Sequence, residues 1–416
     1  MTRMKDSGIK WIGEVPEDWG IVRLKDCLEI NNGKDYKDIE TDETGYPVIG
    51  SGGQFAYARK YLHDGTAILL GRKGTIDKPL YIEGKFWTVD TMFYSVPKSG
   101  IHAKFIYYVA LQIPFGLYST NTALPSMTQT DLQNHHFVMP PLDEQTQIAD
   151  FLDKKVAQLD KVKSLLEEQI KTLEDYRQSL IYETVTKGLD KTVPLKESGV
   201  DWIGQIPEGW GVKRLKNILS DEKDNMKVGP FGSALSGNDI KSFGKKWVYN
   251  QRTVLDNNFI TTDSFIDDTK WEELKSFSVK AGDVLLTTRG TIGKIAIVPE
   301  NNQVGIIHPC LIRFRLNEGM LSGELLKYIF NDTDLVKNQL HYLSNSTTID
   351  VIYSYNLKNI FLPVIPESVQ NKITDFLKRE IARINQMIAI KKEQIENINK
   401  QRQTLIYDYV TGKRRV

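Results

Sequence analysis

The chain has 416 residues, 40% of them hydrophobic, which is long enough for two domains of roughly 150 residues each plus connecting structure. With 54 Lys and Arg against 53 Asp and Glu, the net charge is +1, so bulk charge neither indicates nor excludes a nucleic-acid partner. The sequence has no run of 18 apolar residues and opens on a polar segment, which predicts a cytoplasmic protein with no membrane contact. Cys27 and Cys310 lack metal-ligand spacing, so we expect two packing residues, no disulfide framework and no metal site.

The chain contains an internal repeat. The segment KDSGIKWIGEVPEDWGIVRLK at residues 5–25 returns as KESGVDWIGQIPEGWGVKRLK at residues 196–216, 191 positions later. A second match pairs QIADFLDKKVAQLD at residues 147–160 with KITDFLKREIARIN at residues 372–385, 225 positions apart. The second copy has therefore gained 34 residues between the two matches. Constant ends around a divergent middle predict one scaffold that presents two different recognition surfaces.

The two middle segments alternate short β-rich runs with Gly and Pro, as in residues 66–76 and 282–298, which is typical of mixed α/β domains. A helix is expected in each, near residues 102–112 and 322–331. These domains are assigned to residues 1–141 and 189–366.

Each domain is followed by a long helical segment, at residues 142–188 and 367–416. Each segment runs about 44 residues without Pro or an interior Gly, or roughly 65 Å at 1.5 Å per residue. Apolar residues recur at a 3-4 spacing in one shared register, at Val156, Leu159, Leu166, Ile170, Leu173 and Leu180 and at Ile381, Ile384, Ile388, Ile395, Ile398 and Leu405. We expect an α+β fold in which two mixed α/β domains in tandem are joined by the two long helices, packed as an antiparallel coiled coil. The alternative is two separate amphipathic helices, each covering its own domain.

Several motifs carry a resemblance to a known family. They are the duplicated Trp-Ile-Gly and Pro-Glu-x-Trp segments, GSGG at residues 50–53, GPFGSAL at 229–235, AGDVLLTTRGTIGK at 281–294, and the related PPLDEQTQIADFL and PESVQNKITDFL at 140–152 and 366–377. With these features the chain resembles the specificity subunit of type I restriction-modification systems over nearly its whole length.

The resemblance implies two target recognition domains, each reading one half of a bipartite site in double-stranded DNA. It implies that the long helices set the spacer and dock two methyltransferase subunits, and that motor-nuclease subunits join through that complex. Methylation and cleavage then belong to the partners, so no catalytic residue, cofactor or metal is expected in this chain. One departure is that the second helix opens with Glu-Ser-Val-Gln where the first has Asp-Glu-Gln-Thr-Gln, so the two docking sites need not be equivalent.

Motifs for chemistry give no support to an enzyme. At Gly293-Lys294 the earlier glycine of a P-loop is replaced by Thr288, and Met139-Pro140-Pro141-Leu142 lacks the polar start and the aromatic of a methyltransferase motif. The latter is better explained as a strand end that leads into a helix. Asp77, Glu83 and Lys85 resemble a nuclease triplet of a kind that arises by chance in charged chains.

Candidate DNA contacts are polar side chains on loops, because Arg can read guanine, and Asn or Gln adenine, in the major groove. For any one of them a tight β-turn with a solvated cation is an equally good explanation. The candidates are Tyr57, Arg59, Lys60, Arg72, Lys73, Thr75 and Asn121 in the first domain, and Lys245, Lys246, Gln251, Arg252, Arg289, Thr291, Lys294, Asn345 and Ser346 in the second.

Two rival functions remain at this point: a stand-alone DNA-binding or structural protein, and a coiled-coil adaptor whose β-rich domains bind protein. A specificity subunit should read a different half-site with each domain, and helices of this length predict a gap of several base pairs at 3.4 Å each between the halves.

Overall fold

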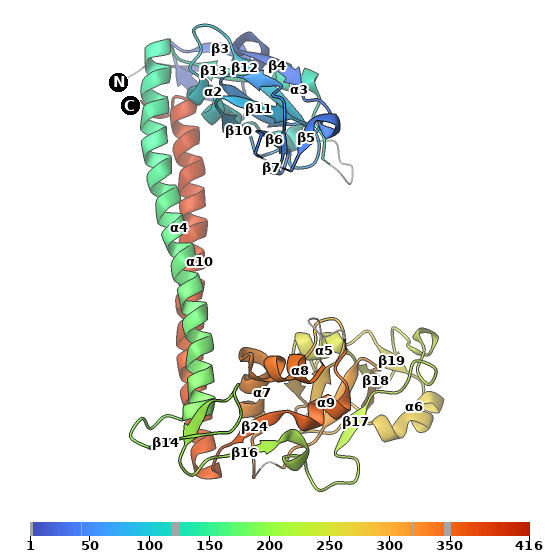
Figure 1. Cartoon of the computed structure of the whole chain (residues 1–416). Helices are drawn as coiled ribbons and strands as arrows, with labels where there is room; N and C mark the ends of the chain where they lie inside the picture. Colours follow the sequence, from blue (N-terminus) through green and yellow to red (C-terminus); the bar gives the residue numbers. More distant parts are fainter. Residues whose placement is uncertain (1–2, 43, 119–124, 318, 345–350) are drawn as a thin grey trace. The chain divides into compact units, whose positions relative to one another are not determined.

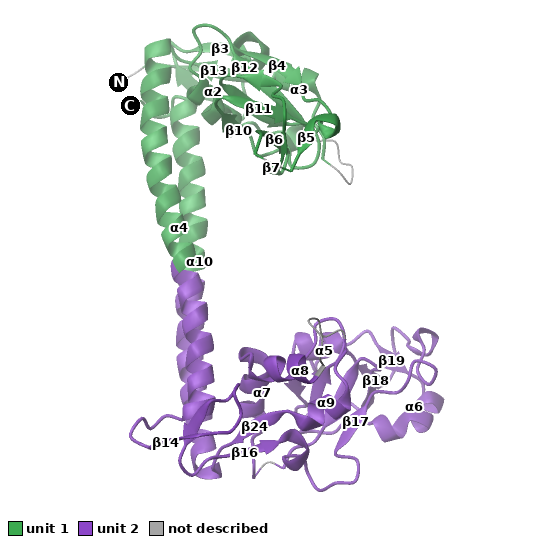
Figure 2. Ribbon diagram, viewed as in Figure 1, with its two compact units in different colours: residues 1–168, 391–416 green, residues 169–390 purple. Residues whose placement is uncertain are grey.

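A computed structural model describes residues 3–42, 44–118, 125–317, 319–344 and 351–416 (Figure 1). The chain divides into two compact units (Figure 2). The first comprises residues 1–168 and 391–416, and the second comprises residues 169–390.

The first unit is built on two sheets. An antiparallel sheet has the order β10-β9-β12-β4, and a mixed sheet has the order β5-β7-β6-β11-β8 with β6 and β11 parallel. Strand β9, with the sequence AILLG, is buried along its whole length, which explains its continuous apolar run. The strands are β4 (Leu28–Asn32), β5 (Glu40–Thr41), β6 (Tyr46–Gly50), β7 (Gly53–Ala58), β8 (His63–Asp64), β9 (Ala67–Gly71), β10 (Leu80–Ile82), β11 (Lys85–Thr88) and β12 (Met92–Pro97).

Two further strand pairs and short helices complete this unit. The pairs are β1 (Met4–Asp6) with β2 (Glu14–Pro16) and β3 (Gly20–Arg23) with β13 (His136–Met139); the helices are α1 (Leu24–Cys27), α2 (Ala103–Ala110) and α3 (Gln129–Asn134), with 3₁₀ helices η1 (Lys37–Ile39) and η2 (Phe115–Leu117). Helix α2 confirms the helix expected near residues 102–112. Its Phe105, Ile106 and Val109 side chains are buried in the core.

The second unit repeats the core of this topology, with three strands in its mixed sheet in place of five. Its antiparallel sheet has the order β17-β23-β20-β21, and in its mixed sheet β19-β18-β22 the strands β18 and β22 are parallel. The strands are β14 (Leu195–Glu197), β15 (Gln205–Pro207), β16 (Gly211–Arg214), β17 (Met226–Val228), β18 (Lys246–Tyr249), β19 (Phe265–Ile266), β20 (Val284–Thr287), β21 (Ile295–Ile297), β22 (Gly305–Ile307), β23 (Leu311–Phe314) and β24 (Phe361–Val364). The helices are α5 (Gln251–Leu255), α6 (Asp268–Leu274), α7 (Gly323–Asp332), α8 (Leu335–Ser344) and α9 (Ser354–Asn359), with η3 (Leu215–Asn217), η4 (Gly237–Asp239) and η5 (Lys275–Phe277).

About half of the extra length of the second copy lies in one connection. Residues 51–66 join β6 to β9 in the first unit, whereas residues 250–283 join the corresponding β18 to β20 and include α5 and α6. Helix α7 confirms the helix expected near residues 322–331 and corresponds to α2. The scaffold is therefore duplicated, and the insertion falls beside the strand ends described below.

The long helices are α4 (Leu142–Lys187) and α10 (Glu367–Val410). In the first unit, Val156 near the start of α4 shares a core with Ile406 and Val410 at the end of α10. In the second unit, the end of α4 shares a core with the start of α10, through Ile181 and Ile373 among others. Each helix thus packs its beginning on the other's end, so the prediction that they pack together is confirmed and they are antiparallel (Figure 1).

Matched polar contacts link the helices in both units. The Arg402 Nε atom lies 3.4 Å from Asp160 Oδ1, and the Arg177 Nη1 atom donates to Asn385 Oδ1 at 2.8 Å. Both pairs occupy corresponding positions, 225 residues apart, so equivalent residues link the two helices in each unit. No helix within the described ranges has the length and apolar character needed to cross a membrane.

A buried glutamine fixes the start of each long helix. The Gln145 Oε1 atom accepts the His102 N–H at 3.0 Å, and Gln370 Oε1 accepts the Ser322 N–H at 2.8 Å. The side-chain amides of both glutamines also donate to a backbone carbonyl just before their helix, Pro140 O and Ile365 O. The two helix starts therefore hold α2 and α7 in the same way.

The neighbouring position differs between the two starts. Glu144 Oε2 accepts the Trp19 Nε1–H at 3.1 Å, and Glu144 Oε1 lies 2.9 Å from Arg415 Nε. The residue in the corresponding place of the second helix is Val369, which has no charge to offer. The Glu144 carboxylate, which distinguishes the start of α4 from the start of α10, therefore has its partners within the first unit.

The end of each long helix contacts a Trp-Ile-Gly segment. The Tyr182 hydroxyl near the end of α4 donates to Trp202 O at 3.1 Å, and the Tyr407 hydroxyl of α10 donates to Trp11 O at 2.9 Å. The duplicated motif at the start of each repeat is therefore a docking point for the last turns of a helix.

Candidate nucleic-acid interface

In the first unit, three loops meet where β6, β9 and β11 end. Strands β6 and β11 are parallel, so their carboxyl ends lie at the same edge. The Arg72 N–H donates to Thr91 O at 2.8 Å, which ties the turn after β9 to the loop after β11. A Cβ atom on Gly74 would lie 3.1 Å from Ser51 Oγ, which brings in the loop after β6.

The second unit builds the same meeting of loops after β18, β20 and β22. The Thr288 N–H donates to Cys310 O at 2.9 Å, and a Cβ atom on Gly290 would lie 3.1 Å from Gln251 Nε2. Gln251 Nε2 also donates to Thr291 O at 3.4 Å. Its polar head therefore lies against the turn rather than away from it.

The two turns correspond residue by residue. Arg72-Lys73-Gly74-Thr75 matches Thr288-Arg289-Gly290-Thr291, since the hydrogen bonds to Thr91 O and Cys310 O start from their first residues. Lys73 forms an isolated bridge with Ser126, and Arg289 forms one with Val351. Both glycines have positive φ, +83° and +66°, a conformation that other residues adopt only with strain. We call these four-residue segments the recognition turns.

Six of the candidate residues thus meet at the recognition turns or directly beside them. Lys73, Arg289 and Thr291 are exposed, whereas Arg72, Thr75 and Gln251 are partly buried. The Arg72 Nη1 atom donates to Asp90 O at 3.3 Å, and its guanidinium carbon lies 5.9 Å from the centre of the Phe93 ring. Arg252 follows Gln251, and its Nε atom pairs with Asp256 at 3.3 Å.

Other candidates lie at the opposite ends of the same strands. Tyr57 pairs with Pro47 and lies near the start of β6, far from Gly50. Arg59 and Lys60 continue beyond it, and the Arg59 Nη2 atom donates to Asp38 O at 3.4 Å. In the second unit Lys245 and Lys246 stand at the start of β18, and the Lys246 ammonium lies 5.1 Å from the Trp271 ring. Asn121, Asn345 and Ser346 lie outside the described residues.

Lys294 has a structural partner. Its Nζ atom donates to Asn331 O at 2.6 Å, and the Asn331 side chain bonds both the N–H and the carbonyl of Ile295. Lys294 thereby joins the segment after the recognition turn to the last turn of α7.

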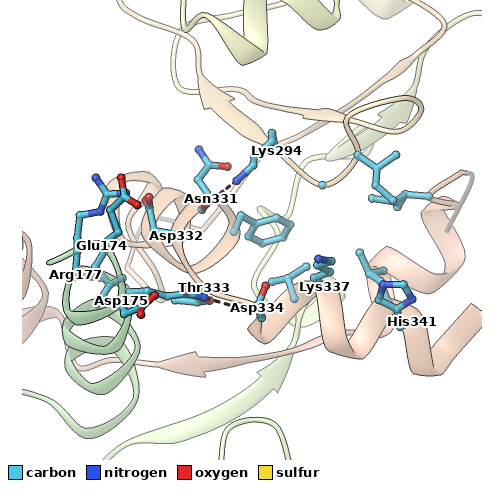
Figure 3. A pocket seen from close by; sticks show the side chains of 18 residues that line it. Glu174, Asp175, Arg177, Lys294, Asn331, Asp332, Thr333, Asp334, Lys337 and His341 are labelled. Atoms are coloured by element: carbon cyan, nitrogen blue, oxygen red, sulfur yellow. Dashed lines mark hydrogen bonds between the residues drawn. The ribbon is translucent and has the colours of Figure 1, made fainter. Parts of the chain in front are cut away.

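Lys294 also lines a cavity of about 780 Å³ among α4, α7 and α8 (Figure 3). Figure 3 shows Asp332 near Arg177 and Glu174 at one end of this cavity, and Lys337 with His341 toward the other. Burial raises the pKa of the Asp332 carboxyl. None of the described residues that line it is a serine or cysteine, so the cavity offers no such nucleophile. Nor do the described residues gather three or more metal-binding side chains anywhere.

Residues that were not among the predicted DNA contacts complete the two loop clusters. They are Ser51, Thr91, His308 and Cys310. The His308 Nδ1 atom lies 2.9 Å from Cys310 Sγ, and burial raises the pKa of the Cys310 thiol. Only Ser51 had a signal in the sequence, through the GSGG motif. The places of Thr91, His308 and Cys310 follow from the pairing of the strands.

A buried ionic network supports the second recognition turn. Asp283 precedes β20 and is 1% exposed; its Oδ1 atom accepts from Arg315 Nε at 2.6 Å, and its Oδ2 atom lies 3.9 Å from Arg313 Nε. Arg313 is 2% exposed and donates to Ser278 O and Asp224 O. Since β20 leads directly into Thr288, this network anchors the strand that carries the turn.

Comparison with known proteins agrees with this architecture. A family model for the type I restriction modification DNA specificity domain matches residues 16–174 and again residues 207–397. The specificity subunit of the type I restriction enzyme MjaVIII from Methanocaldococcus jannaschii is 24% identical, over 97% of this chain and 94% of its own. The EcoBI specificity subunit from Escherichia coli is 24% identical, over 92% and 82%.

Two solved structures share the fold. One, from a study of complex assembly and conformational transition of the type I R-M system, has a TM-score of 0.68 at 16% identity and covers 95% of this chain and 98% of its own. The HsdS subunit from Thermoanaerobacter tengcongensis has a TM-score of 0.51 at 17% identity and covers 98% and 100%. With two copies of the family's domain spanning most of its length, the chain belongs to the type I restriction modification DNA specificity family.

Proposed function

We propose that this chain is the DNA specificity subunit of a type I restriction-modification complex, and that each of its two domains reads one half of a bipartite site. The observation that carries the proposal is the recognition turn, which is built twice at the same strand ends of one scaffold with different neighbours. Gly74 of the first turn faces Ser51, whereas Gly290 of the second faces Gln251, and the first residue is Arg72 in one turn and Thr288 in the other. Different side chains at equivalent positions would read different bases.

The proposal assigns the domains to residues 1–141 and 189–366 and the long helices to 142–188 and 367–416. In this role the helices set the spacer and dock two methyltransferase subunits, and motor-nuclease subunits join through them. The chain itself would be non-catalytic and cytoplasmic, and cofactors would bind to its partners. The names of the MjaVIII and EcoBI specificity subunits, to which the chain is similar, support the role of a specificity subunit.

The candidate contacts are ranked by their position. Lys73, Thr75, Arg289, Thr291 and Gln251 lie at the recognition turns and are the first choice for DNA contact. Tyr57, Lys60 and Lys245 belong to a second group at the far strand ends, where they could reach only a flanking part of the duplex.

The test is co-expression of the chain with its methyltransferase subunit, followed by mapping of methylated bases in the host genome. A motif with two defined halves and a fixed gap is expected. A chimera that exchanges residues 21–140 for those of a relative should change one half only. Stable partner binding with no DNA affinity and no motif would instead favour a coiled-coil adaptor.

A further inference from the structure

We propose that the two recognition turns divide the work of DNA binding in the same way in both domains: Lys73-Gly74-Thr75 and Arg289-Gly290-Thr291 each clamp one backbone phosphate regardless of sequence, while the residues that differ around them read bases. This inference rests on the proposed function and adds to it which residues supply affinity and which supply specificity.

The fold accounts for part of the shared sequence of the turns. Glycine is required at positions 74 and 290 because φ is positive there. Ile76 is buried in the first core, and Ile292 packs against the second. Backbone conformation and packing therefore explain why a Gly and the following Ile return in both places, but they do not explain the cation before the Gly or the threonine after it.

The cations have no structural task in the described part of the chain. Lys73 and Arg289 are exposed, and neither pairs with a carboxylate of any residue that the structure describes. By contrast, Arg252, Arg315 and Lys270 of the second unit are each paired with an acidic side chain. An unpaired cation at the same point of both turns fits an anionic ligand that both domains share.

Backbone amides point to the same ligand. After the positive-φ glycine, the N–H groups of Thr75 and Ile76, and likewise of Thr291 and Ile292, donate to no residue within the described ranges. Successive free N–H groups next to a left-handed residue form a concave anion site. The threonine hydroxyl and the cation add a donor and a charge, so the four groups together match one phosphate.

The neighbours of the turns lack this agreement. Gly74 faces Ser51, whereas Gly290 faces Gln251. The first residue is Arg72 in one turn and the buried Thr288 in the other. Gln251 has the amide head that can read adenine with two hydrogen bonds, and the phosphate clamp would hold it at a fixed distance from the groove.

The test uses the full chain purified with its methyltransferase subunit, and duplexes with or without the mapped motif. Binding is measured between about 50 and 200 mM salt for Lys73→Gln, Arg289→Gln and the double variant. Each single change should lower the slope of log affinity against log salt by about 0.9, and the double change by about twice that. The fold loss of affinity should be equal on both duplexes, and the methylated motif should not change.

Four control variants separate the effect of charge from effects of folding and base recognition. Lys223→Gln removes an exposed cation at the opposite end of the sheet and should leave the slope unchanged. Lys73→Arg and Arg289→Lys keep the charge and should keep the slope, which separates charge from folding. Gln251→Ala should keep the slope and relax the second half of the motif alone.

An unchanged slope in Arg289→Gln, or a half-site altered by it, would overturn the division of work while leaving the specificity role intact. If the parent complex itself binds no motif-bearing DNA, the proposed function fails instead.

Discussion

Replacing the buried carboxylate Asp283 by asparagine should destabilise the second unit. The substitution keeps the shape of the side chain but removes the buried negative charge that faces Arg313 and Arg315. Breaking a buried ion pair costs about 3–5 kcal/mol. Because asparagine can still accept from Arg315 Nε, we expect the lower end, about 3 kcal/mol. At roughly 2–4 °C per kcal/mol for a unit of this size, the melting temperature should fall by about 6–12 °C.

The matched control is Glu222→Gln. Glu222 also pairs with Arg315, at 2.6 Å, but its side chain is 52% exposed. An exposed pair contributes only about 0–1 kcal/mol. Calorimetry of the full chain gives the melting temperatures, and hydrogen exchange in β20 and β23 places the change in the second unit. A fall of under about 2 °C for Asp283→Asn, or equal falls for both variants, would refute the reasoning.

Three further outcomes are expected. Glu324→Lys breaks the exposed 3.3 Å ion pair with Lys378 and should lower the free energy of unfolding by roughly 0.5 kcal/mol. Adding Lys378→Glu should restore this stability in a double-mutant cycle, and no recovery would contradict the pairing. Burial above all lowers the pKa of His135 from 6.5 to about 4. The first unit should therefore keep its full stability above pH 6.5 and lose about 3 kcal/mol as the pH falls to 4, because the unfolded chain binds the proton more readily. Denaturant titrations should find this pH dependence flattened in His135→Phe. Burial, chiefly, raises the pKa of the Cys27 thiol to about 11, so alkylation at pH 8 should label Cys27 only after unfolding, and labelling of the folded chain would show that the thiol is accessible.

Periodicity and repetition in the sequence were enough to predict the framework. The apolar stripes of α4 and α10 predicted two long helices whose apolar faces pack either on each other or on their own domains. The core that contains both Val156 of α4 and Ile406 of α10 shows that the helices pack on each other. The expected helices near residues 102–112 and 322–331 also exist, as α2 and α7. Such features depend on spacing within one segment, which a single sequence displays directly.

The recognition surface was only partly predictable, because it depends on which strand ends share an edge. Arg72 and Arg289 were found from a Gly-containing turn after an apolar run. Lys245 and Lys246 were also predicted as DNA contacts because they are charged, yet they stand at the opposite end of β18 from Gln251. Whether β18 pairs parallel with β22 is a matter of tertiary contact, and local composition carries no information about it.

Residues 391–416 complete the core of the first unit, so this core cannot be completed early in synthesis. Ile406 and Val410 belong to the same core as Val15 and Leu24, so the first unit lacks part of its interior until residues 391–410 have been synthesised. While the second unit is being translated, the apolar face of α4 around Val156 has no permanent cover. A stop codon after residue 390 would therefore remove part of the core of the first unit, and the truncated chains should be degraded by proteases rather than persist as half-active subunits.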